Sequence, residues 1–461
     1  MLHYLTLTAC LVTAFLSGAQ NEFNVWHFGS TAIDFNSGTA VALPQTSVFS
    51  SESTSGICNA QGQLLFYSNG GNSNTYPAVQ GRVWNANHQV MPNGLLQNIA
   101  GCHSTYQGII VLPDPANGIT KTQTQNYYII TLDCVENMYS SPQENKGLRY
   151  TKIDMSLDNG LGDVTQKGIP IVPMPIFGSN ATINEVLTAM PHINGQDYWI
   201  HFGHSDSVGT VLLTANGFSA PFNQDIDPNK MAASPANNKL AVDNRIYDFN
   251  PMTGLLTHLA TVSGSSPCFS PSGEFLYMMN GTTLYQYDVT LPDIPGSQTV
   301  ISTAAAGTPI LAPDRRIYFM GDGNNPIRKR INCPNGAGAS CGFDPSYQLQ
   351  LTGTVRNGNP NFLQSTFYYP GNPCTEPMAV TEQELVTLIA WPNPSAGTVR
   401  ISHPFEVLDL NLTDVRGRNM ASLTVKSGEE IDLTSLNSGI YFFVPAGKEA
   451  VKPLRLEILN P

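Results

Sequence analysis

The sequence predicts an all-β protein, an about seven-bladed β-propeller followed by a small C-terminal β-sandwich. Three observations support this prediction: the composition, a turn-and-strand repeat, and a second set of short strands near the end of the chain. The 461 residues include 40 Gly and 33 Pro, and only 12% are charged. This composition suits short strands joined by tight turns, because helices favour Ala, Leu, Glu and Lys. The length fits one large and one small domain.

A turn followed by a strand rich in Leu, Tyr and Phe recurs along the chain. In the clearest copy, "SPSGEFLYMMN" from residue 270, Pro271 and Gly273 suit a tight reversal before an apolar strand. Further copies are "NAQGQLLFYSN" from residue 59, "INGQDYWIHFG" from 193, "SPANNKLAVD" from 234 and "APDRRIYFMGD" from 312, while "TQNYYIITLD" from 124 keeps only the strand. From about residue 195 onward the copies are roughly 35 to 45 residues apart, the length of a four-stranded propeller blade.

One such sheet cannot bury both of its faces, so the sheets are expected to pack around a common axis. Residues 20–371 would supply roughly 50 residues for each of seven blades. A pair of β-sandwiches is the alternative architecture for the same strands.

The first residues, "MLHYLTLTACLVTAFLSGAQ", predict a secretory signal peptide over residues 1–19 that is cleaved between Ala19 and Gln20. A lipidation box ending at Cys10 is the alternative for this segment. No later segment reaches the ~18 apolar residues of a membrane span, so we expect no transmembrane span in the mature chain. The formal net charge of -12, without a run of Lys or Arg, argues against nucleic acid or an anionic membrane as partner.

Seven cysteines remain after the predicted cleavage. Cys333 and Cys341 flank the loop "PNGAGAS", and closing such a loop by a disulfide is favoured in an oxidising compartment, so we predict that these two cysteines pair. The sequence does not pair the others, which are Cys58, Cys102, Cys134, Cys268 and Cys374. Because the number is odd, at least one thiol should be free.

Several stretches of the large domain together resemble one known family. They are "NVWHFGSTAIDFNSG", "GQLLFYSNG", "VWNANHQVMPNG", "GLRYTKIDMSLDNGLGDV" and "NPNFLQSTF". Taken jointly they are similar to exported WD40-like propellers of Bacteroidetes-type bacteria, over nearly all of residues 24–368. The resemblance implies a propeller and no settled activity.

The chain restarts with "AWPNPSAGTVRI" at residues 390–401, after a Pro-, Thr- and Glu-containing stretch over 372–384 that predicts a linker. Short alternating strands bounded by Gly, Asn or Asp follow, so residues 385–461 are expected to form a small β-sandwich. This module resembles the type A C-terminal sorting domain of the type IX secretion system. The resemblance rests on Pro392, Asn393, Pro394, Gly397, Asp414, Gly417, Asp432, Leu433, Leu436, Gly439 and Tyr441.

What the resemblance implies is export. Residues 385–461 would engage the type IX secretion machinery, which carries the folded chain across the outer membrane, and the domain is commonly cut off afterwards. The propeller would then be secreted or attached to the outer-membrane surface.

The large domain carries no decisive catalytic motif, and no H-E-x-x-H, phosphate-binding glycine loop or C-x-x-C pair is present. The string "GASCG" at residues 338–342 fits G-x-S-x-G but lies in the loop next to Cys341 that has no strand or helix pattern, so it is not expected to form a nucleophile elbow. Three sets of polar residues have ligand-like spacing: His192, His201, His204 and Asp206; Asn223, Asp225, Asp227 and Asn229; and Asp154, Asp158 and Asp163. For each set, turn and core roles are favoured over metal binding, so no cofactor and no metal is expected. Stacking on sugar rings is conceivable for Trp26, Trp84, Tyr76 and Trp199, although core packing is favoured.

The sequence therefore favours a secreted or cell-surface propeller that binds a glycan, protein or surface polymer through a loop-lined face, without chemistry of its own. The alternative is a propeller hydrolase or lyase that acts on polysaccharide or peptide, with paired carboxylates at the mouth of the channel. A third hypothesis is a structural adhesin within a surface assembly.

The export hypothesis predicts the result of a truncation. Deleting residues 385–461 in the native host should leave the propeller inside the cell, because the sorting module carries the export signal. Immunoblots of cell fractions and medium measure this, with the full chain as control. Normal amounts of the truncated propeller in the medium or at the surface would show that the sorting assignment is wrong.

Overall fold

The computed structural model divides into two compact units, Met1–Met378 and Ala379–Pro461. It describes residues 21–44, 46–71, 79–97, 99, 101–118, 125–138, 146–172, 183–320, 327–356, 360–371, 374, 386–414, 418–445 and 451–459. The boundary between the units falls inside the predicted linker. The predicted cleavage at Ala19 and Gln20, and the positions Cys10, Tyr76 and Gly417, lie outside the described residues.

The described residues of the first unit form seven antiparallel sheets, here called blades 1 to 7 in chain order. Blades 1 to 3 are β1 (Val25–Phe28), β2 (Thr31–Asp34) and β3 (Val41–Ala42); β4 (Ser55–Cys58), β5 (Leu64–Ser68), β6 (Arg82–Asn85) and β7 (Val90–Leu95); and β8 (Ile109–Pro113), β9 (Asn126–Leu132), β10 (Leu148–Asp154) and β11 (Asp163–Val172). The helix α1 (Val135–Met138) and the 3-10 turns η1 (Pro115–Asn117) and η2 (Asp158–Gly160) lie in loops of blade 3.

Blades 4 to 7 follow the same order. They are β12 (Ile183–Pro191), β13 (Tyr198–His204), β14 (Ser207–Thr214) and β15 (Gly217–Phe218), with β16 (Phe222–Gln224) also on β14; β17 (Met231–Ala233), β18 (Lys239–Val242), β19 (Arg245–Phe249) and β20 (Leu256–Thr261); β21 (Ser265–Phe269), β22 (Phe275–Asn280), β23 (Thr283–Asp288) and β24 (Thr299–Ser302); and β25 (Thr308–Leu311), β26 (Ile317–Met320), β27 (Arg330–Ile331) and β28 (Phe343–Asp344). The turns η3 (Pro295–Ser297), η4 (Gly338–Cys341) and η5 (Gln364–Phe367) lie between or after these strands.

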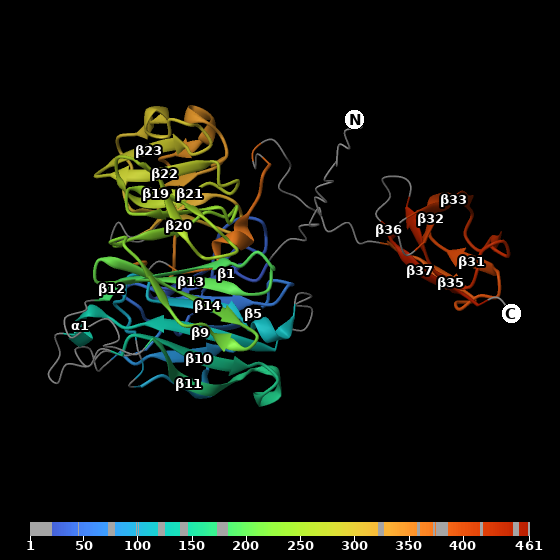
Figure 1. Ribbon diagram of the computed structural model, residues 1–461, viewed down its shortest axis with the longest axis horizontal. Helices are drawn as coiled ribbons and strands as arrows, with labels where there is room; N and C mark the ends of the chain where they lie inside the picture. The colour runs from blue at the N-terminus through green and yellow to red at the C-terminus, as the bar shows by residue number, and fades with distance from the viewer. Residues whose placement is uncertain are drawn as a thin grey trace, which may run out of the picture. The chain divides into compact units, whose positions relative to one another are not determined.

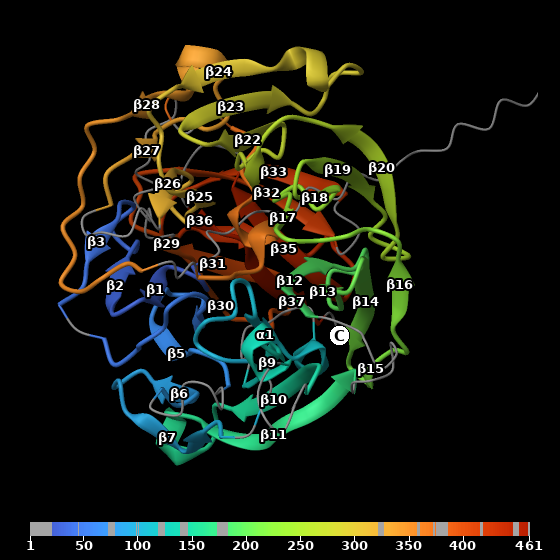
Figure 2. The ribbon, with the colours of Figure 1, turned by 90° about the vertical axis from the view of Figure 1, so that its left-hand side faces the viewer.

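The seven blades close into a ring. The first strands β1, β4, β8, β12, β17, β21 and β25 contact one another in this order, and Figure 2 shows the sheets arranged around a common centre. Blade 7 meets blade 1 where the Arg316 Nη1 donates to the Gly38 carbonyl oxygen over 3.4 Å and the rings of Phe35 and Tyr318 lie 6.0 Å apart. The predicted seven-bladed propeller is therefore confirmed, and a pair of β-sandwiches is excluded for this unit.

The repeat found in the sequence is the second strand of a blade. Its six copies contain β5, β9, β13, β18, β22 and β26, each hydrogen-bonded between the first and third strands of its sheet. A second strand has neighbouring strands on both edges and neighbouring blades on both faces, so its side chains are removed from solvent. Every residue of β13 and β26 is buried. The corresponding strand of blade 1 is β2, whose four residues "TAID" lack the Leu, Tyr and Phe that mark the pattern.

The turn before β22 shows why the repeat carries glycine. Gly273 has φ of 75°, and its N–H donates to the Ser270 carbonyl oxygen over 2.9 Å. A Cβ atom at this position would lie 2.4 Å from the Ser234 Oγ of the neighbouring blade. Both the backbone conformation and the close approach of blade 5 therefore require glycine.

After blade 7 the chain returns to the interior of the ring, where residues 360–367 form what we call the plug. The Asn361 N–H donates to the Thr54 carbonyl oxygen over 2.8 Å in blade 2, and its Nδ2 donates to the Leu187 carbonyl oxygen over 2.7 Å in blade 4. Phe362 stacks on Trp26 at 5.1 Å and contacts the ring of Phe23 at 5.2 Å. Truncating such a buried ring to Ala typically costs about 3–5 kcal/mol. The plug therefore ties the first blades to one another from inside (Figure 2).

The cysteines pair differently from the prediction. The structure joins Cys333 to Cys374 and Cys102 to Cys134, so the predicted pair of Cys333 and Cys341 is wrong. The backbones of Cys333 and Cys341 do lie side by side, since the Cys333 N–H donates to the Cys341 carbonyl oxygen over 2.9 Å. The Cys341 thiol, however, is buried against the Tyr277 hydroxyl, while Cys333 bonds to the cysteine that follows the plug.

The second unit (Figure 1) has its own core. Its strands are β29 (Val386–Thr387) paired with β36 (Val451–Lys452), β30 (Ile389–Trp391), β31 (Thr398–Ser402) and β34 (Glu430–Asp432) in one sheet, and β33 (Asn419–Val425), β32 (Leu408–Asp414), β35 (Gly439–Pro445) and β37 (Leu454–Ile458) in another. Buried residues of both larger sheets, such as Ile401 and Phe443, belong to one hydrophobic cluster. The alternation expected for this module therefore forms two sheets around a shared core.

The observed pairing of cysteines has a measurable consequence. Cys374→Ser should leave Cys333 as a free thiol and lower the free energy of unfolding by about 2–4 kcal/mol, because a loop of 41 residues is no longer closed. Thermal unfolding and peptide mapping without reductant measure both effects. Cys341→Ser is the matched control and should release no new thiol. A free Cys333 thiol in that control would show that Cys333 pairs with Cys341 and not with Cys374.

Candidate functional site at the channel mouth

A small cavity lies in the centre of the ring, and its surroundings are here called the channel mouth. First strands of four blades line it together with the loop before β8 and the plug; the lining includes Tyr106, Gln107, Thr188, Lys230, Ser266, Thr308, Asn361 and Gln364. Several of these residues precede a first strand or begin it, so the same edge of successive blades supplies them. The cavity volume is about 80 Å³, well below the roughly 300–1,000 Å³ of pockets that enclose whole small molecules. It can receive one chemical group of a larger ligand.

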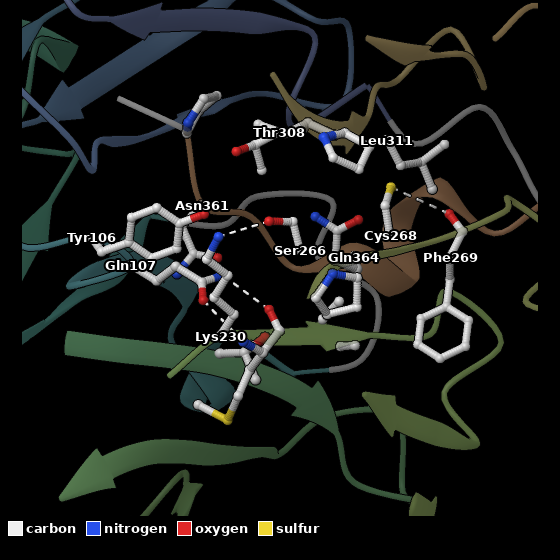
Figure 3. A pocket seen from close by; sticks show the side chains of 18 residues that line it. Tyr106, Gln107, Lys230, Ser266, Cys268, Phe269, Thr308, Leu311, Asn361 and Gln364 are labelled. Carbon is white, nitrogen blue, oxygen red and sulfur yellow. Dashed lines mark hydrogen bonds between the residues drawn. The ribbon is translucent and has the colours of Figure 1, made fainter. Parts of the chain in front are cut away.

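Lys230 is the charged residue of this cavity. Its Nζ donates to the Ser266 Oγ over 2.7 Å and lies 5.3 Å from the centre of the Tyr106 ring (Figure 3). Burial lowers the pKa of Lys230, and the negative charge of Asp243 opposes this shift. The Asp243 carboxylate accepts the backbone N–H groups of Asn229 and Lys230 at 3.0 Å each, and its ion-pair partner is Arg245 at 3.8 Å.

Two amide side chains hold the walls of the cavity in place. The Gln107 Nε2 donates to the Met231 carbonyl oxygen over 3.0 Å, and the Met231 N–H donates to the Gln107 Oε1 over 3.1 Å. This pair of bonds connects the loop before β8 to blade 5, just as Asn361 connects blades 2 and 4. The cavity is thus a rigid feature of the ring.

Three glutamates gather beside the loop that carries Tyr106. Glu52 precedes β4, Glu136 lies on α1 and Glu185 lies on β12. Burial raises the pKa of Glu52 to about 7, and the negative charge of Glu136 adds to this effect. Burial also raises the pKa of Glu185 to about 7, with Glu136 and Glu52 contributing, although the Val135 N–H bond opposes the shift. Like charges in a partly dry site favour the neutral acids.

A disulfide fixes the loops of this glutamate cluster. The bond between Cys102 and Cys134 joins the loop before β8 to the start of α1, and the Ser104 Oγ donates to the Glu136 carboxylate over 2.6 Å. Cys102, Cys134 and Glu136 are the one group of three potential metal ligands within the described part of the chain. Two of its ligand atoms are sulfurs of a disulfide, which are not the thiolates that bind metals.

The candidate histidines do not come together. His201 is fully buried with its Nδ1 3.0 Å from the Thr210 Oγ1, and burial lowers its pKa to about 3. His204 Nε2 lies 3.0 Å from the Asn223 Oδ1. His192 accepts the Asn194 N–H in a turn, and Asp206 lies in the turn between β13 and β14. The structure therefore gives these histidines roles in the core and in turns.

The two acidic sets are also distributed over turns and strands. Asp227 accepts the Asn184 Nδ2 over 3.3 Å, whereas Asn229 donates to Asp243. Asp154 accepts the Ser156 N–H, and Asp163 accepts the Asn93 N–H, each over 2.8 Å. The remaining members, Asp158 and Asp225, are exposed.

Three of the four aromatic residues considered for sugar stacking are in the core. Trp26 is fully buried, Trp84 stacks on the ring of Tyr67 at 5.3 Å, and the Trp199 Nε1 donates to the Pro251 carbonyl oxygen over 3.0 Å. They support the blades and do not line the cavity.

The predicted sorting residues shape the turns of the second unit. Asn393 accepts the Glu457 N–H over 3.0 Å and donates to the Arg455 carbonyl oxygen over 2.9 Å, so the segment from Pro392 to Pro394 is attached to β37. Gly397 has φ of 117°, which favours glycine. The others support neighbouring turns or the core: Asp414 accepts the Arg418 N–H, Asp432 accepts the Thr434 N–H, Leu433 is buried, Leu436 packs against the cluster, Gly439 begins β35 and the Tyr441 hydroxyl donates to the Asn437 carbonyl oxygen.

Residues 389–452 match the family described as "Secretion system C-terminal sorting domain". The second unit is a sorting domain. The sequence resemblance to a type IX sorting module is thereby confirmed, and the sorting domain directs the chain for export to the cell surface or beyond.

The rest of the chain resembles solved structures only in fold. A protein from Lactobacillus plantarum matches with a TM-score of 0.43 and 13% identity, over 70% of this chain and 92% of that one. A β-propeller domain from Myceliophteria thermophila matches with a TM-score of 0.36 and 10% identity, over 65% and 93%. The periplasmic gluconolactonase of Pseudomonas aeruginosa matches with a TM-score of 0.35 and 13% identity, over 83% and 100%. No curated protein matches the chain.

Reasoning from sequence missed the residues of the channel mouth. Glu52, Glu136 and Glu185 come from three separate loops or strands, and no motif joins them. Lys230 ends the stretch "NQDIDPNK", where its single positive charge after five acidic or amide residues was the one available signal. The sorting domain, in contrast, carries its signal within one continuous segment.

The raised pKa values predict how stability depends on pH. Because the folded pKa of Glu52 is about 7 and its ordinary value is 4.5, the stabilisation from the neutral acid is complete below pH 4.5 and is lost as pH rises through 7. Glu52→Gln removes the charge, so it should raise the melting temperature by a few °C at about pH 8 and leave it unchanged at about pH 4.

Thermal unfolding across this pH range measures the effect. Glu274→Gln, at an exposed position of blade 6, is the matched control and should change neither value. An equal effect of both substitutions at high pH would contradict a special environment around Glu52.

Proposed function

We propose that this protein is a secreted or surface-attached binding propeller whose ligand, a glycan, protein or surface polymer, docks at the channel mouth. In this proposal residues 1–19 form a signal peptide cleaved between Ala19 and Gln20, and the sorting domain engages the type IX secretion machinery. The described residues contain no helix long and apolar enough to cross a membrane.

The observation that carries the proposal is the cavity itself. First strands of blades 4 to 7 and the plug converge on it, and it contains one ammonium group among amide, hydroxyl and apolar neighbours. A concave site with a few convergent polar groups is the usual form of a binding pocket. Its small volume supports docking of a protruding group of a larger ligand.

The glutamate cluster supports a second candidate, a hydrolase or lyase that acts on polysaccharide or peptide. A carboxyl group with a pKa of about 7 suits general acid catalysis at neutral pH, and Glu52 and Glu185 both meet this condition. Glu185 accepts the N–H groups of Val135 and Tyr106, which supports a structural role for it. Glu52 is therefore the residue to test in the enzymatic hypothesis.

One experiment separates the two candidates. The purified protein is applied to a glycan array and to a panel of chromogenic glycoside and peptide substrates. Binding without turnover is the expected outcome. Turnover that Glu52→Gln lowers by at least about 100-fold, the usual contribution of a general acid, would replace the binding function by the enzymatic one. Glu274→Gln is the control, and the absence of both binding and turnover would refute both candidates.

A further inference from the structure

The ammonium group of Lys230 lies in the channel mouth, and no carboxylate of the described residues forms an ion pair with it. Three blades supply the residues at this ammonium group: Lys230 itself precedes β17, its partner Ser266 lies on β21, and Tyr106 precedes β8. Among the described residues, no carboxylate lies within 4.0 Å of its Nζ. A partly buried charge is costly unless it is paired, so this arrangement favours a negatively charged group in the cavity.

The cavity limits the size of that group. A volume of about 80 Å³ accommodates a carboxylate and a few neighbouring atoms, and not a complete sugar ring or an amino-acid residue with its flanking backbone. The ligand must therefore place one group at Lys230 while its remainder lies outside the cavity. Figure 3 shows the Lys230 side chain extended between Tyr106 and Ser266, with Gln364 of the plug nearby.

The negative charge of the protein limits the number of negative groups that the ligand can carry. The chain has a formal net charge of -12, which creates a negative field around it. This field would repel a densely charged polyanion. A ligand with one carboxylate among neutral groups fits better.

The residues that line the cavity beside Lys230 indicate which groups of the ligand lie next to its carboxylate. Thr308 and Gln364 line the cavity with hydroxyl and amide groups, and Tyr106 contributes an aromatic ring. Hydroxyl and amide groups exchange hydrogen bonds with the hydroxyls of a sugar, and an aromatic ring provides an apolar face. We propose that the channel mouth binds a sugar acid at the end or on a branch of an extracellular glycan, with the sugar carboxylate at Lys230. This inference deepens the proposed binding function and rests on it.

Calorimetric titration of the purified full chain at neutral pH tests the assignment with three probes: D-glucuronate, D-glucose as its neutral counterpart, and triglycine as a peptide carboxylate. Glucuronate should bind at least about tenfold more tightly than glucose, as expected for a hydrogen bond to a charged group. Lys230→Met should remove this preference, whereas Lys230→Arg should keep most of it.

Lys239→Met is the matched control, because Lys239 lies in the same blade and pairs with Asp248 over 3.1 Å outside the cavity. Melting curves establish whether each variant is folded. If Lys230→Met does not fold, the preference of Lys230→Arg for glucuronate over glucose still tests the role of the positive charge. Equal binding of glucose and glucuronate, or unchanged glucuronate binding by folded Lys230→Met, would overturn the inference.

The other outcomes are also decisive. Triglycine binding as tight as that of glucuronate would overturn the assignment to a sugar. A neutral glycan bound on the array, with no response to glucuronate, would refute the sugar acid and leave the binding function in place. No ligand on the array at all would refute glycan binding as the function of this propeller, and the sugar acid with it.

Discussion

The structure depends on covering both faces of every blade. A sheet whose second strand is wholly buried, such as that of β13 or β26, is stable only between two other sheets, and a ring supplies two neighbours to each of its members. The first strands then face the centre, where side chains and backbone must also be satisfied. The plug meets this requirement: Asn361 bonds to blades 2 and 4, and Phe362 completes the aromatic cluster around Trp26.

Among the described residues, the plug leaves a small cavity in the centre of the ring. Residues of the plug and the first strands of blades 4 to 7 line this cavity, and Lys230 and Ser266 are among them. Two kinds of charge adjoin it. The ammonium lacks a carboxylate partner among the described residues, whereas the glutamates beside Tyr106 are driven toward their neutral form by burial and by one another.

The sorting domain, unlike a single blade, has a hydrophobic core of its own. Its core is formed by its own residues, so it can fold without help from the propeller, as a module that is recognised separately must. Several of the residues that mark its family shape turns, among them Asn393, Gly397 and Asp432, which lie at or near the ends of its strands. Cys374, bonded to Cys333, anchors the end of the propeller before this second unit begins.

Local patterns determined the class of fold, the blade strands and the sorting domain. A strand that is buried on both faces, such as β26, needs mainly apolar residues, and a chain reversal like that at Gly273 needs glycine. Neither requirement depends on residues far away in the sequence. Only the tertiary structure decided the disulfides, the plug and the channel mouth. Cys333 lies eight residues before Cys341 but bonds to a cysteine 41 residues away, and Lys230 meets Tyr106 and Ser266 from other blades, because ring closure and not sequence distance sets these contacts.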